Sequence, residues 1–247
     1  MSTSPPPLPV ASFQPPPPAK GIPLPLIIIG VVVLCVIGIA MLAGLAAPGF
    51  VCMRKKAEQV VAMNNGRSLI LALNDFNAEY GSFPDRETAK QVAARTQTPL
   101  DLTGDTANDY FRQLIAAGVA ESEDPFYAKT SSSPKRPDNK MTGNEALKAG
   151  EVGFGYLLNG ERAIGDDDPN RILAVTPLSR TGTSGQFDAQ PFDHRAIVVR
   201  VDGSVKPEPL LEDGRLLLGR NKTLLDTGPN TIWGTAIKPV IKPPKTR

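Results

Sequence analysis

Residues 24–47 read LPLIIIGVVVLCVIGIAMLAGLAA and contain no charged side chain. At roughly 1.5 Å of rise per residue, a helix of this length covers about 36 Å, while the hydrocarbon core of a membrane is about 30 Å thick. No face of such a helix is polar, so lipid is its most favourable environment. We therefore expect a transmembrane helix over residues 24–48 that anchors the rest of the chain.

The segment before this apolar run, residues 1–23, is rich in proline. Proline runs favour extended polyproline II with a solvated backbone, which predicts a disordered tail that acts as a spacer. A docking peptide for an aromatic-lined groove stays open as an alternative for this segment, and a cleaved signal peptide as an alternative for the apolar run. The apolar run is longer than a typical signal core, and Lys20 is the only basic residue before it.

Charge and cysteine content limit the class of protein. The chain has 27 basic and 25 acidic residues, and every acidic one lies after Phe50. This near balance argues against nucleic-acid binding, which needs a basic surface to replace counterions on phosphates. The two cysteines, Cys35 and Cys52, lie in or just after the apolar run, so disulfides do not hold the following domain.

Helical periodicity resumes after Pro48 and defines a second segment, residues 49–84. Apolar residues recur at helical spacing, namely Met53, Ala57, Val60, Leu69, Leu73, Phe76 and Tyr80. Gly81 is a typical C-cap, and Pro84 prevents continuation. We expect an amphipathic continuation of the first helix, kinked at Pro48, that packs its apolar face on a folded domain.

Residues 85–210 carry the signals of that α+β domain. Helices are predicted at 86–95 and 106–117, a polar loop at 129–140, and strands at 152–158, 171–177, 196–201 and 204–207. The pair Asp202 and Gly203 between two extended runs predicts a hairpin turn. The C-terminal extension, residues 211–247, is expected to be partly disordered.

This order resembles the type IV pilin and type II secretion pseudopilin family. The similarity rests on Asn64 and Asn65, on the L-x-L-A-L pattern at 69–73, on YGSFP at 80–84 and on AIVVRVDGSV at 196–205. It implies a pilin-like fold, in which the long helix is a spine packed on a small antiparallel sheet.

Two departures from the family's pattern limit what the resemblance implies. Residues 21–25 read GIPLP in place of the usual prepilin cleavage motif, and no acidic residue precedes Glu58. The family's glutamate near the start of the mature helix pairs with a neighbouring subunit, so this device for filament register is absent. The chain therefore resembles a pilin relative that is neither processed nor polymerised in the usual way.

Candidate sites are few. Asp166, Asp167 and Asp168 with Asn170 form an acidic loop, and the resemblance implies calcium as one interpretation, since some pseudopilins bind it through a loop. A solvated turn between strands is the alternative and the one we favour, because EF-hand spacing is missing. Asp202 is expected to be a turn residue.

Catalytic and cofactor motifs are also missing. His194, the single histidine, lies near Asp188, but no G-x-S-x-G motif accompanies it, and one histidine is too few for a zinc site. Gly153, Gly155 and Gly160 lie in a strand pattern rather than in a nucleotide-binding loop. We therefore predict no catalytic, cofactor-binding or metal-binding residues, no cofactor and no enzymatic activity.

The side of the membrane on which the domain lies is predicted from the basic residues Arg54, Lys55 and Lys56. For these residues, contact with lipid headgroups is favoured over a partner site. The positive-inside rule places the domain in the cytoplasm, whereas the resemblance places it outside the inner membrane of a bacterium. We follow the resemblance.

The function predicted from the sequence is a single-pass, membrane-anchored, pseudopilin-like structural or interaction protein related to type II secretion. Its expected partners are the lipid bilayer, other pseudopilin-like proteins and copies of itself. Self-association would use small residues of the first helix, namely Gly38, Ala40, Gly44 and Ala47. The alternatives are a tethered extracytoplasmic binding module that does not assemble and an anchored hydrolase that uses His194.

Overall fold

The computed structural model describes residues 24–180, 185–219 and 221–246. Within the first helix, side chains are described at positions 25, 28–30, 32–38 and 41 and from position 53 onward. The chain divides into two compact units, residues 1–50 and 51–247. The expected tail at 1–23 lies outside the described residues.

Helix α1, Leu24–Tyr80, runs for 57 residues. No helix in the described part of the chain combines the length and the apolar character needed to cross a membrane. A span needs roughly 20 consecutive apolar residues, and before Met53 the described side chains lie only between positions 25 and 41. The expected transmembrane helix over residues 24–48 is therefore contradicted, as is the single-pass placement in the inner membrane. The side chains of Pro48, Ala40, Gly44 and Ala47 lie outside those described.

The C-terminal part of α1 has one buried face. Leu69, Leu73 and Phe76 are fully buried at helical spacing, while Leu71 between them is 64% exposed. This confirms the amphipathic pattern over that stretch. The pattern does not extend to Met53, Ala57 and Val60, which are exposed, because among the described side chains the buried face begins at Ala62.

Helix α1 ends where the sequence indicates. Gly81 has φ +75° and donates its N–H to the carbonyl of Asn77 at 2.8 Å, which closes the last turn. Positive φ is tolerated there because glycine has no Cβ. Asp85 then caps helix α2, Arg86–Thr96, through a reciprocal capping box with Thr88. The same Asp85 accepts the N–H of Ala163 at 3.2 Å, so this cap also fixes the start of α2 to the sheet.

Helix α3, Ala107–Ala116, is nearly all buried and lies against the sheet. Phe111 stacks on Phe126 with 5.2 Å between ring centroids, and its edge meets Tyr156 at 5.5 Å. Phe126 ends the short 3-10 helix η1, Asp124–Phe126, and a second one, η2, covers Gly143–Glu145. These aromatic contacts fill the core between α3 and the first strand.

The sheet is entirely antiparallel and has the strand order β2-β1-β3-β4-β5, with β6 also paired to β1. Its strands are β1 Gly155–Asn159, β2 Arg162–Ala163, β3 Ile172–Thr176, β4 Arg195–Arg200, β5 Val205–Pro209 and β6 Pro239–Lys242. The α+β class, helices α2 and α3, the strands within the four predicted stretches and the hairpin turn are thus confirmed. Only Gly203 of the turn has positive φ, +81°. Neither β2 nor β6 was predicted.

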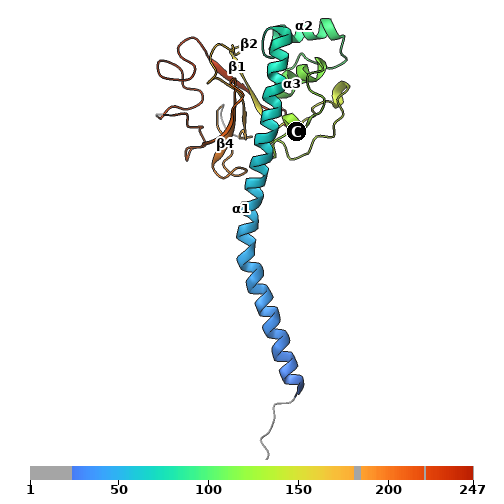
Figure 1. Ribbon diagram of the computed structural model, residues 1–247, viewed down its shortest axis with the longest axis vertical. Helices are drawn as coiled ribbons and strands as arrows, with labels where there is room; N and C mark the ends of the chain where they lie inside the picture. The colour runs from blue at the N-terminus through green and yellow to red at the C-terminus, as the bar shows by residue number, and fades with distance from the viewer. Residues whose placement is uncertain (1–23, 181–184, 220, 247) are drawn as a thin grey trace, which may run out of the picture. The chain divides into compact units, whose positions relative to one another are not determined.

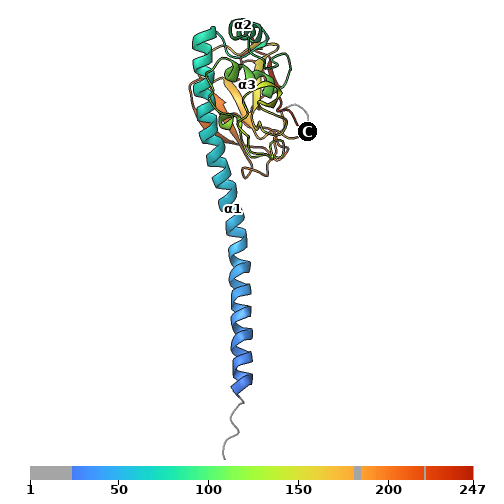
Figure 2. The ribbon, with the colours of Figure 1, turned by 90° about the vertical axis from the view of Figure 1, so that its right-hand side faces the viewer.

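The spine helix and the sheet approach each other closely at Gly66. A Cβ added there would lie 3.0 Å from Val205 Cγ1 and 3.2 Å from Val199 Cγ2, on strands β5 and β4. The adjacent Asn65 donates its side-chain amide to the carbonyl of Tyr127 at 2.8 Å. Figures 1 and 2 both show the C-terminal part of α1 running alongside the sheet-bearing domain. Gly66 is therefore the point at which the absence of a side chain permits this packing.

We predict that Gly66→Val lowers the free energy of unfolding by about 1–3 kcal/mol, because the added atoms overpack the contact with β4 and β5. Urea unfolding followed by circular dichroism measures this. Ser68→Val, at an exposed position of the same helix, controls for the helix propensity of valine and should change stability by less than about 0.5 kcal/mol. Equal effects of the two substitutions would contradict the close approach.

Candidate functional site

The acidic loop at 166–168 does not gather its carboxylates. Asp166 accepts the side-chain amide of Asn77 at 2.9 Å, and Asp167 pairs with Arg171, whose Nη2 lies 2.9 Å from Oδ2. Asp168 accepts the backbone N–H of Asn170 at 2.9 Å. Each side chain thus has its own partner, as in a turn, and the geometry offers no shared position for a cation.

His194 does not form a catalytic arrangement. It is exposed with φ +57°, and its backbone N–H and C=O bond to Ala189 and Leu210. Asp188 instead accepts the N–H of Gln190 at 3.0 Å. Asp202 accepts the N–H of Ser204 at 2.8 Å, which confirms it as a turn residue. The prediction that the chain is not an enzyme stays a prediction.

Arg54, the first of the three basic residues after position 53, takes part in a chain of ion pairs. Arg54 Nε lies 3.1 Å from Glu58 Oε1, and Lys129 Nζ lies 2.7 Å from the same oxygen. Burial tends to raise the pKa of Glu58, but the hydrogen bonds and charges of Lys129 and Arg54 together lower it. Glu58, the first acidic residue of the chain, is therefore engaged within its own subunit, where it links α1 to the loop at 129–140.

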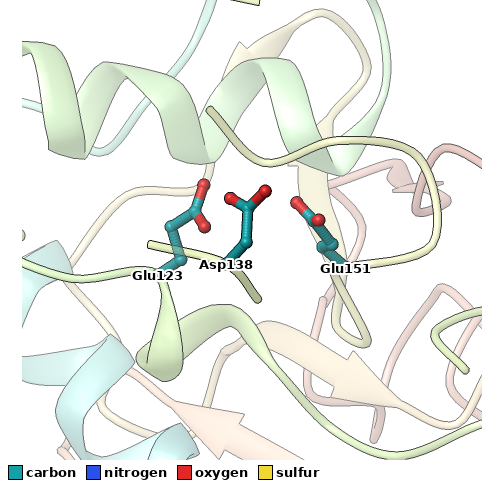
Figure 3. Close-up of side chains that lie close together, drawn as sticks. All are labelled: Glu123, Asp138 and Glu151. Atoms are coloured by element: carbon teal, nitrogen blue, oxygen red, sulfur yellow. The ribbon is translucent and has the colours of Figure 1, made fainter. Parts of the chain in front are cut away.

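Three carboxylates that sequence reasoning missed lie close together. They belong to Glu123, Asp138 and Glu151, and one oxygen of each lies within 4.8 Å of the others (Figure 3). Glu123 is the N-cap residue of η1, Asp138 lies in the polar loop at 129–140, and Glu151 precedes β1. Their spacing in the sequence matches no ligand motif, so it is the fold that brings them together.

Burial and hydrogen bonding divide the cluster into a closed and an open side. Glu123 is 0% exposed and Glu151 is 3% exposed, whereas Asp138 is exposed. Glu123 Oε1 accepts the N–H of Leu147 at 2.6 Å, and Glu151 Oε2 accepts the N–H of Lys148 at 2.9 Å. Glu123 Oε2 is buried without a hydrogen-bond partner among the described residues. A buried oxygen in this state is costly for the fold.

Charge in the cluster follows from these contacts. Burial raises the pKa of Glu123, and the charges of Glu151 and Asp138 raise it further, against the hydrogen bonds from Leu147 and Asn139. The exposed Asp138 has a lowered pKa, chiefly because it accepts a hydrogen bond from Lys148, with Nζ to Oδ2 at 3.0 Å. The arrangement can hold a proton or a cation.

A second feature is the apolar surface of α1 before Met53. Among its described side chains, those of Val32, Val33, Leu34, Val36 and Ile37 are all about half exposed or more. Consecutive helical residues point in successive directions, so this stretch is apolar on all sides. Cys35, a free and exposed thiol, lies in the same stretch.

Comparisons with the models of protein families, with curated proteins and with solved structures found no match. The resemblance to pilins and pseudopilins therefore rests on the residues of this chain alone and stays a prediction.

We predict a pH dependence of stability from Glu123 in the presence of a chelator. Its folded-state pKa lies above the ordinary value of 4.5, so between these two values the folded chain holds a proton that the unfolded chain has released. Stability from this group is therefore lost as pH rises through that window. Glu123→Gln cannot ionise, so it should gain stability relative to the natural chain as pH rises above 4.5.

Urea unfolding at several pH values checks this expectation. The exposed Gln91 of α2 supplies the control, since Gln91→Asn changes no titratable group and should give a difference that is independent of pH over the same range. The assignment to Glu123 is wrong if Glu123→Gln also gives a constant difference.

Proposed function

We propose that the protein is a pilin-like structural subunit that associates with copies of itself through the N-terminal part of α1. The observation that carries this proposal is the stretch 32–37, whose described side chains are apolar and exposed in every direction around the helix. A helix that is apolar all round is stable only when it is buried. In the proposed assembly, the same helix of other subunits buries these side chains.

The distribution of these side chains favours several neighbours over one. In a two-fold dimer, each helix covers only one face of its partner, and the other side of a uniformly apolar helix stays in water. An assembly of several helices covers a larger part of each helix. Full burial of each Val, Leu or Ile side chain contributes about 1.5–3 kcal/mol, so a few such residues can offset the cost of association.

The residues that carry the pilin resemblance fasten α1 to the domain. Asn65 bonds to the carbonyl of Tyr127, Gly81 closes the last turn of α1, and Phe83 is buried in the core. Such a chain presents a helix for association on a domain that folds by itself. A structural subunit needs one part that folds and another that associates. This arrangement therefore supports the proposal without requiring a catalytic or ligand site.

The assembly we propose differs from that of typical pilins. Those use a glutamate near the helix start to pair with a neighbour, whereas the first acidic residue here, Glu58, is already paired with Arg54 and Lys129 of its own chain. Association would therefore rest on apolar packing rather than on a charge pair between subunits. Apolar packing sets register less strictly, because it is not directional.

Cross-linking through the cysteines tests self-association. The full chain carries two thiols, Cys35 and Cys52, so a membrane-permeant bismaleimide can link one subunit to two neighbours and should produce a ladder of dimers and higher oligomers in expressing cells. Val33→Asp with Ile37→Asp should reduce the ladder at least tenfold, because two unpaired charges would enter an apolar contact.

Two controls make the result specific. Val33→Leu with Ile37→Leu preserves the apolar surface and should keep the ladder, and Gln91→Asp adds a charge at an exposed position of α2 and should not affect it. A single band at all protein levels would contradict the proposal and favour a binding module that does not assemble.

A further inference from the structure

We propose that Glu123, Asp138 and Glu151 form a binding site for one Ca²⁺ ion. The site goes beyond the proposed structural role, because association through α1 requires no ligand. Its three residues come from separate segments of the chain, and Figure 3 shows their carboxylates side by side.

The buried oxygen of Glu123 is the first argument. Oε2 has no hydrogen-bond partner among the described residues, although the side chain is completely buried and Oε1 is held by the N–H of Leu147. A native fold rarely leaves such an atom unsatisfied unless a ligand completes its environment. Glu123 Oε2 is therefore placed as a ligand atom for an ion.

The contacts of the other two carboxylates leave room for the same ion. Glu151 uses Oε2 to accept the N–H of Lys148, which leaves Oε1 available. Asp138, at the exposed side, is held by the N–H of Lys140 at 3.1 Å and by Lys148 Nζ at 3.0 Å. Lys148 Nζ also pairs with Glu145 at 2.5 Å, so it can keep a partner when an ion replaces it at Asp138. The ion would enter from this exposed side.

The chemistry of the donors selects calcium. All three ligands are carboxylates, and hard oxygen donors suit Ca²⁺ or Mg²⁺, whereas zinc sites use histidine or cysteine, which this group lacks. Ca²⁺ accepts irregular arrangements of six to eight oxygens, including waters, whereas Mg²⁺ demands near-ideal octahedral geometry. Ligands from three separate loops meet the requirement of Ca²⁺ more readily.

The expected effect is structural. An ion at this position neutralises the repulsion among three carboxylates and joins η1, the loop at 129–140 and the start of β1. Binding to the folded state alone stabilises it by linkage. Calcium should therefore stabilise the sheet-bearing domain, residues 51–247, against unfolding.

The test uses the full chain, freed of metal with a chelator and then dialysed. Titration calorimetry with CaCl₂ should show one ion bound per chain. Saturating Ca²⁺ should raise the Tm by roughly 5–10 °C, and Mg²⁺ at the same concentration should have a much smaller effect.

Variants assign the ligands. Glu123→Gln and Asp138→Asn should each weaken calcium binding at least tenfold, and Asp166→Asn, in the other acidic loop, should leave it unchanged. Asp138 is exposed, so its variant should fold even if that of Glu123 does not.

Three outcomes would overturn the site. They are the absence of both heat and Tm shift with Ca²⁺, unchanged binding in Asp138→Asn, and an equal response to Mg²⁺. If lower pH stabilises the fold and Ca²⁺ does not, Glu123 binds a proton and is not a metal ligand.

Discussion

The packing of one face of α1 against the sheet is the constraint on which the domain depends. At Gly66 the helix lies so close to Val199 and Val205 that even a methyl group would press on them. Leu69, Leu73 and Phe76 then continue the buried face to the end of the helix. Since cores tolerate neither gaps nor extra atoms well, this one contact sets where the helix crosses β4 and β5.

Local signals explain why much of this fold could be predicted from the sequence. The spacing of Leu69, Leu73 and Phe76, the cap at Asp85 and the Asp202–Gly203 turn depend on neighbours within a few residues. Strand β6 does not. Its sequence, between prolines and lysines, resembles a tail, and it becomes a strand because β1 offers a free edge and Asp105 pairs with Lys242 at 2.7 Å. Such partners are distant in sequence and leave no local pattern.

The acidic residues show more clearly that local sequence patterns do not predict contacts between distant residues. Three consecutive aspartates at 166–168 attract attention in the sequence, yet each has a separate partner in the fold. Glu123, Asp138 and Glu151 are unremarkable in the sequence, and the fold brings them together with two of them buried. The chemical role of a carboxylate is thus decided by its burial and by its neighbours, neither of which is visible from residue spacing alone.

The two parts of α1 use the same kind of side chain under different conditions. From Ala62 onward, the apolar residues on one face of α1 belong to the hydrophobic core of the same chain, so folding alone buries them. The described apolar side chains between positions 28 and 41 remain exposed, so their burial requires something other than this domain. The division of the chain into two units near residue 50 agrees with that difference. The buried core of residues 51–247 and the exposed apolar side chains of the N-terminal part of α1 therefore belong to separate compact units.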